Sequence, residues 1–242
     1  MSNKLRLVAL PIKATTATTA TPQITLLSQP PTVALQENYL TKTINWCDRQ
    51  WNKLSDSADG HWKKRVWNGG ESVMDRVPYT EWALKHIEPG QSVAPNSTHK
   101  LDILYPKSVI SDKDLLNMVK ASFISRAARH RRSMWIALFI APITLPVAII
   151  PVVPNLPLFY VLWRAWSHWR AHRGAVYLGR LLANNQLNPR ESDELDRFIS
   201  THPNLTTKDI NTLSKILKLP PQATLEAHRA VKQIDSDSKR QE

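Results

Sequence analysis

Residues 134–163 read MWIALFIAPITLPVAIIPVVPNLPLFYVLW, and this stretch decides how the rest of the chain is interpreted. It contains no charged side chain, and Thr144 and Asn155 are nearly its only polar residues. A helix that spans a membrane needs about 20 predominantly apolar residues, so the stretch is a transmembrane candidate. The alternative is a helix buried in a large soluble core. The length of the run favours the membrane, and we expect an integral membrane protein.

Prolines determine the shape expected of this region. Five of them interrupt the run, and three fall within PVVPNLP, residues 151–157. Each proline lacks an N–H group and crowds the preceding turn, so it kinks or ends a helix. A continuous helix over the run would also measure about 45 Å, against a hydrocarbon core of about 30 Å. The expected fold is mostly α, with a proline-broken helical hairpin, or one kinked span, between two small helical soluble segments.

The distribution of charge agrees with a hairpin. The net charge is +12, and residues 115–190 hold ten basic residues and no acidic one. Cationic flanks prefer the cytoplasm-like side of a membrane, and here they lie at both ends of the apolar run. This pattern explains the basicity without nucleic acid. The competing hypothesis is a soluble basic protein that binds nucleic acid through tryptophan and arginine side chains.

The segment that leaves the apolar run, WRAWSHWRAHRGAVYLGRLL at residues 163–182, mixes tryptophan with arginine. Tryptophan rings favour the boundary of a bilayer, and cations favour anionic lipid headgroups. We therefore expect contact with a lipid bilayer containing anionic lipid. The residues predicted to lie at the membrane interface are Arg131, Arg132, Trp163, Arg164, Trp166, His168, Trp169, Arg170 and Arg173.

Four segments are expected along the chain. Residues 1–36 contain no acidic residue and form a candidate mitochondrial targeting segment. Residues 37–110 form an N-terminal helical region, which includes an amphipathic helix near 40–54, a helix at 61–67 and a short strand or link at 101–106. Residues 111–185 form the membrane region with its basic flanks, and begin with a capping box at Ser111 and Asp114. Residues 186–242 form a C-terminal helical region with helices near 206–218 and 222–234.

Side chains with a catalytic pattern are not found in the sequence. It has no phosphate-binding glycine loop, nucleophile elbow or metal signature, so we expect neither an enzyme nor a bound cofactor or metal. His168 and His172 have the spacing of a metal pair, but without a third ligand nearby a surface pair is the simpler interpretation. The absence of carboxylates between Asp114 and Glu191 also argues against a proton-coupled carrier formed by this chain alone.

Several blocks of the sequence are similar to those of a known family. The segment PNLPLFYVLWRAWSHWRAHRGAVYL, residues 154–178, resembles the signature of the fungal mitochondrial K+/H+ exchange-related proteins. LRLVALPI at 5–12, HWKKRVWNGG at 61–70 and RVPYTEWALKHI at 76–87 resemble further blocks of that family, in the same order. The resemblance implies a protein of the mitochondrial inner membrane that is needed for potassium–proton exchange. It implies no catalytic residues.

Two functional hypotheses follow. In the first, the chain is an accessory or regulatory component of a potassium–proton exchange system, and contributes to cation homeostasis through contacts with lipid and with other inner-membrane proteins or copies of itself. In the second, oligomers of the chain form the antiporter and transport the ions, with His130, His168 or His172 handling protons.

Overall fold

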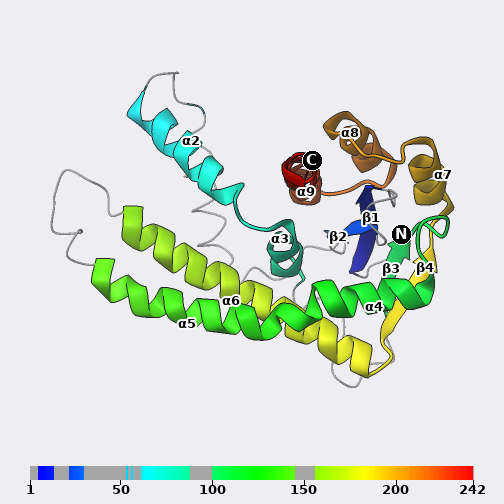
Figure 1. Cartoon of the computed structure of the whole chain (residues 1–242), viewed down its shortest axis with the longest axis horizontal. Coiled ribbons are helices and arrows are strands. Elements are labelled where there is room, and N and C mark those ends of the chain that lie inside the picture. Colours follow the sequence, from blue (N-terminus) through cyan, green and yellow to red (C-terminus); the bar gives the residue numbers. More distant parts are fainter. Residues whose placement is uncertain are drawn as a thin grey trace. The chain divides into compact units, whose positions relative to one another are not determined.

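Figure 1 shows the computed structural model of the chain, which describes residues 5–13, 22–29, 53, 56, 61–87, 100–144 and 156–241. The chain divides into two compact units. The first contains residues 31–78 and the second contains residues 4–30 and 79–242. In the first unit, helix α2 spans Trp62–Met74 and begins after the cap residue His61, whose ring accepts a hydrogen bond from the backbone of Lys63. The other elements named below, all within the described residues, belong to the second unit.

A four-stranded mixed sheet forms the centre of the second unit. Its strand order is β2-β1-β3-β4; β1 pairs antiparallel with β2 and parallel with β3, and β3 pairs parallel with β4. Pro189 is tolerated in β4 because this strand lies at an edge of the sheet. The strands are β1 (Arg6–Lys13), β2 (Gln23–Gln29), β3 (Leu101–Tyr105) and β4 (Leu187–Glu191).

Helices cover both faces of this sheet. Alternate residues of β1 point to opposite sides, so that Leu7 packs with α3, α4 and α6 whereas Leu10 packs with α7, α8 and α9. Because both faces are covered, β1 is a nearly continuous apolar run without the alternation of a half-exposed strand. The helices are α3 (Tyr79–Lys85), α4 (Asp112–Ser122), the 3-10 turn η1 (Ile124–Arg126), α5 (Ala127–Thr144), α6 (Leu156–Ala183), α7 (Asp193–Thr201), α8 (Thr207–Ile216) and α9 (Pro221–Gln241).

The expected fold class, a mostly α integral membrane protein, is wrong. A mixed sheet with helices on both faces replaces it, and no helix among the described residues is long and apolar enough to cross a membrane. The physical reason is that each of the two helices that share the apolar run takes only a short part of it and combines that part with basic residues. Helix α5 takes only residues 134–144 of it after a basic first half, and α6 takes residues 156–163 before Arg164 and further arginines. Neither a transmembrane hairpin nor one kinked span is formed by these helices.

Helices α5 and α6 lie side by side (Figure 1). They run antiparallel, since His130 near the start of α5 contacts His168 near the middle of α6, whereas Ile140, later in α5, and Tyr160, earlier in α6, line one pocket. Helix α5 passes through Pro142 in its last turn and ends at Thr144. The predicted break at 151–157 lies almost entirely outside the described residues.

Several local predictions are confirmed. Residues 101–105 form strand β3, and Ser111 caps α4 by accepting a hydrogen bond from the backbone of Asp114. The two expected C-terminal helices are α8 and α9, and the helix expected at 61–67 is α2, which continues through Gly69 and Gly70. The amphipathic helix expected near 40–54 lies outside the described residues, apart from Lys53. Residues 6–13 and 23–29 form β1 and β2, whereas a targeting role of residues 1–36 stays a prediction.

Gly174 allows α6 to approach the C-terminal end of α3 closely. A Cβ atom at Gly174 would lie 2.1 Å from the backbone oxygen of Leu84, a distance that no packed atom pair tolerates. At Gly179, by contrast, a Cβ atom would lie 3.2 Å from a methyl group of the Ile124 side chain, which can shift. The contact between α3 and α6 therefore depends on the missing side chain at Gly174.

We expect Gly174→Ala to lower the free energy of unfolding by about 3 kcal/mol, the upper part of the range for overpacked sites, because helix backbones must separate. Gly179→Ala is the matched control and should change it by less than about 1 kcal/mol. Urea unfolding of both variants measures the two values. Equal effects of the two substitutions would show that the approach of α3 to α6 is not tightly packed.

Candidate functional site: a buried charge cluster

The most polar part of the interior is centred on the carboxylate of Glu81, a buried residue of helix α3. Glu81 is 2% exposed and accepts hydrogen bonds from Arg164 and Ser167 of α6. The Arg164 Nη1 to Glu81 Oε1 distance is 2.8 Å, and the Ser167 Oγ to Glu81 Oε1 distance is 2.5 Å. A second Arg164 nitrogen lies 3.4 Å from Glu81 Oε2. The guanidinium thus contacts both carboxylate oxygens, an arrangement that suits the planar fork of arginine.

Two histidines extend this cluster to α5. His130 Nδ1 lies 3.2 Å from His168 Nδ1, and His168 Nδ1 lies 3.6 Å from Glu81 Oε2. Arg164 Nη2 is 2.9 Å from His168 Nε2. Because arginine can only donate, His168 Nε2 accepts and the proton of the neutral ring sits on Nδ1. That proton is donated to His130 Nδ1, so His130 carries its own proton on Nε2.

Burial and charge set the protonation of these groups. Burial alone would raise the pKa of Glu81, but the hydrogen bond from Ser167 and the nearby guanidinium of Arg164 hold that pKa below its usual value. Burial lowers the pKa of His130 to about 4, although Glu81 opposes the shift. Burial also lowers the pKa of His168 against the opposing effect of Glu81. At neutral pH the cluster therefore holds an ionised carboxylate, a guanidinium and two neutral imidazoles.

Lys85 lies beside the cluster in an aromatic setting. Its side chain is buried, with Nζ 3.5 Å from the ring centre of Trp82 and 5.0 Å from that of Trp163. Nζ has no hydrogen-bond partner among the described residues. Burial lowers the pKa of Lys85 to about 7, against an opposing effect of Glu81. Contacts with ring faces compensate only partly for the lost hydration of an ammonium group.

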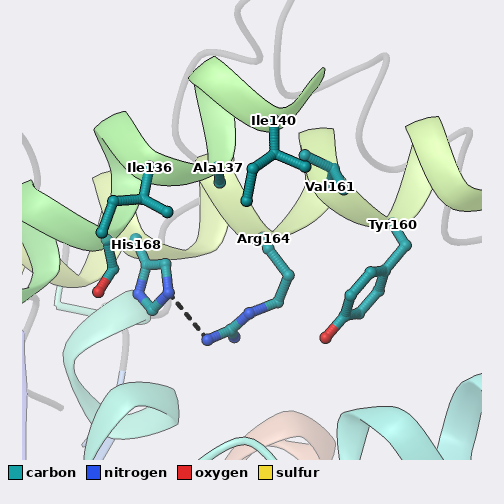
Figure 2. Close-up of a pocket in the computed structure, with 8 residues that line it drawn as sticks. Ile136, Ala137, Ile140, Tyr160, Val161, Arg164 and His168 are labelled. Carbon is teal, nitrogen blue, oxygen red and sulfur yellow. Dashed lines mark hydrogen bonds between the residues drawn. The ribbon is translucent and has the colours of Figure 1, made fainter. Parts of the chain in front are cut away.

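A pocket of about 250 Å³ adjoins the cluster between α5 and α6. Figure 2 shows Arg164 between His168 and Tyr160 on α6, with apolar side chains of α5 opposite. The pocket therefore has mostly apolar walls and one polar end, where Arg164 and His168 reach the ion pair. Its lining consists of Ser133, Ile136, Ala137, Ile140, Tyr160, Val161, Arg164 and His168.

The residues predicted to lie at a membrane interface fall into two groups. Arg164 and His168 belong to the buried cluster, and Arg170 donates hydrogen bonds of 3.1 and 2.8 Å to the backbone oxygen of Lys85. Trp163 and Trp166 are half-buried. The ring centre of Trp163 lies 6.4 Å from that of Trp82, and the ring centre of Trp166 lies 5.3 Å from the guanidinium carbon of Arg170. The structure thus gives these five side chains partners within the second unit.

The remaining four predicted interface residues are exposed. Arg131 and Arg132 lie on the first half of α5. Arg173 lies over the ring of Trp169, with 4.8 Å between the guanidinium carbon and the ring centre. Contact of any of the nine residues with a bilayer stays a prediction.

Sequence reasoning missed Glu81 and Lys85, and only partly anticipated the histidines. His130 and His168 were expected to titrate near a membrane, and the structure brings them together within the second unit. His172, in contrast, lies apart and has its Nδ1 3.0 Å from the backbone oxygen of Ala127. One feature of the sequence did point to such a pairing. Residues 115–190 contain no Asp or Glu, so any acidic partner for Arg164 had to come from a distant segment.

The lowered pKa of Lys85 predicts a specific pH dependence. Above pH 7 the folded chain releases the proton of Lys85, whereas the unfolded chain keeps it to about 10.4. The unfolded state then binds more protons, so this lysine destabilises the fold least at high pH. Lys85→Met should therefore raise the free energy of unfolding more at pH 6 than at pH 9, measured by urea unfolding.

Lys120→Met, at an exposed position of α4, provides the control and should show no such pH-dependent difference. If Lys85→Met raised the free energy of unfolding by the same amount at pH 6 and pH 9, the lysine would not change its charge in the folded state over that range.

Comparison with known proteins gives the family. The model of the mitochondrial K+-H+ exchange-related family matches residues 6–182. This range includes the central strand β1 and every residue of the buried cluster. No solved structure matches the chain.

Two curated fungal proteins are similar to the chain. One is an uncharacterized protein of Schizosaccharomyces pombe, 26% identical over 173 residues, which cover 71% of this chain and 75% of that protein. The other is an uncharacterized protein of Saccharomyces cerevisiae, 31% identical over 163 residues, which cover 57% of this chain and 51% of that protein. With most of its length matched by the family model, the chain belongs to the mitochondrial K+/H+ exchange-related family.

Proposed function

We propose that the chain is an accessory component of mitochondrial K+/H+ exchange, without enzymatic activity, that acts at the inner membrane through contacts with anionic lipid. The family relates the chain to the exchange process in mitochondria. The observation that carries the proposal further is an exposed apolar surface on α5 and α6, bordered by arginines.

This surface, here called the apolar end, lies on the part of α5 after Arg132 and on the first turns of α6. Phe139 and Ile143 are each 74% exposed, and Phe159 is 67% exposed. Large exposed apolar patches mark contact sites for proteins or membranes. The apolar end consists of Trp135, Ile136, Leu138, Phe139, Ile140, Ile143, Phe159, Tyr160 and Leu162.

Charge next to the apolar end favours lipid as its partner. Arg131 and Arg132 are exposed one turn before it on α5, and Arg173 with Trp169 is exposed further along α6. Apolar side chains that enter the acyl boundary, followed by tryptophan and arginine at the level of the headgroups, are the arrangement of an interfacial membrane contact. The cations of such a contact favour anionic phospholipid.

The buried cluster supports an accessory role over a carrier. Proton-coupled carriers place ionisable groups, often carboxylates, along the path of the ion. Here Glu81 is held ionised by Arg164 and Ser167, and burial keeps His130 and His168 neutral. These groups are bound to one another, which suits a rigid element better than a site that exchanges protons.

We expect the purified chain to float with phosphatidylcholine vesicles that contain anionic phospholipid, and to float much less with vesicles of phosphatidylcholine alone. The double variant Phe139→Ser and Ile143→Ser should lose most of this binding, because it removes two of the most exposed apolar side chains. The matched control is Ile216→Ser and Leu225→Ser, which alters exposed apolar residues of α8 and α9 and should bind as the wild type does.

The same variants connect lipid binding with function. In mitochondria that lack the chain, wild type and the α8/α9 control should restore potassium–proton exchange, whereas the Phe139/Ile143 variant should not. Equal flotation of all three proteins would contradict the lipid contact. If flotation were equal and only the Phe139/Ile143 variant failed to restore exchange, the apolar end would contact a protein instead.

A further inference from the structure

Three groups with metal-ligating atoms converge inside the second unit. Glu81 comes from α3, His130 from α5 and His168 from α6, and one ligand-type atom of each lies within 4.8 Å of those of the other two. Glu81 and His130 are buried, and His168 is half-buried. Since α3 is separated from α5 by more than forty residues of chain, the fold brings these groups together and their spacing in the sequence does not.

We propose that Glu81, His130 and His168 form a binding site for a divalent metal ion of the zinc class, and that Arg164 competes with the ion for the same ligands. The family membership and the proposed accessory function do not enter this inference. It is based on the distances, the donor atoms and the hydrogen-bond directions of the cluster.

Two of the three distances between the ligand atoms are close to the edge of a tetrahedral site, and the third pair, Glu81 and His130, lies within 4.8 Å. With metal–ligand bonds of about 2.0–2.1 Å, neighbouring ligands of a tetrahedral zinc ion are about 3.3 Å apart. The two Nδ1 atoms of His130 and His168 are 3.2 Å apart, and His168 Nδ1 is 3.6 Å from Glu81 Oε2. Side-chain adjustments within the cluster would bring Glu81 and His130 around one ion with His168.

The donor chemistry selects the class of metal. Two imidazole nitrogens and one carboxylate oxygen form a common ligand set of zinc, whereas magnesium and calcium prefer oxygen ligands alone. Three protein ligands leave a fourth position to a water molecule or an anion. His168 also lines the pocket between α5 and α6, and this pocket provides a path for the ion to enter.

His130 has the tautomer that metal binding at Nδ1 requires. The hydrogen bonds of Arg164 and His168 place the proton of His130 on Nε2, which leaves the lone pair of Nδ1 directed at the cluster. His130 is 5% exposed, and its Nε2 has no partner among the described residues. A buried N–H group without an acceptor costs free energy, and metal binding at Nδ1 leaves this group as it is.

Arg164 contacts two of the three ligands in the absence of an ion. Its guanidinium binds Glu81 and donates to His168 Nε2, which keeps the proton of His168 on Nδ1. Metal binding at Nδ1 moves this proton to Nε2, where it would face the N–H group of Arg164. The arginine must then turn away, and the pocket that it already lines offers the space. The ion and the guanidinium therefore exclude each other.

The test uses the purified full chain after treatment with a chelator. We expect it to bind one equivalent of Zn²⁺ in competition with a chromophoric chelator, and to bind Co²⁺ with the intense visible absorption of a tetrahedral complex. His130→Asn and His168→Asn should each weaken binding by at least about 100-fold, because each removes one of only three ligands. His172→Asn is the matched control on α6 and should bind as the wild type does.

Competition between Arg164 and the ion predicts a change in Zn²⁺ affinity that a purely structural role of Arg164 would not give. Arg164→Gln should tighten Zn²⁺ binding by about tenfold, whereas a role limited to holding the ligands in place would weaken it. Because ions that bind only the folded state raise the melting temperature, Zn²⁺ should raise it for the wild type and for Arg164→Gln but not for His130→Asn. This readout also shows that each variant is folded.

Three results would overturn the site. One is no stoichiometric binding by the wild type. Another is equal binding by the wild type and His130→Asn, which would place the ion at other histidines. The third is weaker binding by a folded Arg164→Gln variant, which would remove the competition on which the geometry depends.

Discussion

The ion pair between Glu81 and Arg164 is the interaction on which the arrangement of helices α3, α5 and α6 depends. Both charges are largely removed from water, and removing one partner of such a pair typically costs about 3–5 kcal/mol because the other charge is left buried. Ser167 and His168 complete the hydrogen bonds of the pair. The carboxylate thus fixes which face of α6 is turned toward α3.

Further contacts between α6 and α3, later along α6 than Arg164, support this pair. Gly174 lets α6 approach the backbone of Leu84, and Arg170 donates to the backbone oxygen of Lys85, so three successive turns of α6 are tied to one short helix. The first part of α6 lies beyond these contacts and, with the second half of α5, carries the apolar end. A rigid base and an exposed apolar end suit an element that holds a partner, and the lipid contact proposed above uses that division.

The sequence predicted the local elements well and the overall architecture poorly. Capping at Ser111, the strand at 101–105 and the C-terminal helices follow from short-range rules, and all are present. The sheet could not be predicted because β1 is covered on both faces, so its apolar run shows no alternation of apolar and polar residues. The membrane assignment of the run at 134–163 was wrong because α5 and α6, the two described helices that share the run, each combine only a short part of it with basic residues.

The candidate site could be predicted only in part for a related reason. Its arginine and histidines stand in one conspicuous basic block, but the carboxylate that they bind lies more than eighty residues earlier in α3. Hydrogen-bonded pairs at such a separation have no signature in a single sequence, because the topology alone determines which segments meet. This carboxylate, Glu81, is also one of the three ligands of the proposed metal site.

We propose that the chain assists potassium–proton exchange and does not itself carry the ions. The decisive experiment is reconstitution: the purified chain alone is placed in vesicles containing anionic phospholipid, a potassium gradient is imposed, and the internal pH is recorded, with a potassium–proton ionophore as the positive control. For an accessory protein we expect no pH change beyond that of empty vesicles. A potassium-driven pH change that increases with the amount of chain would contradict it.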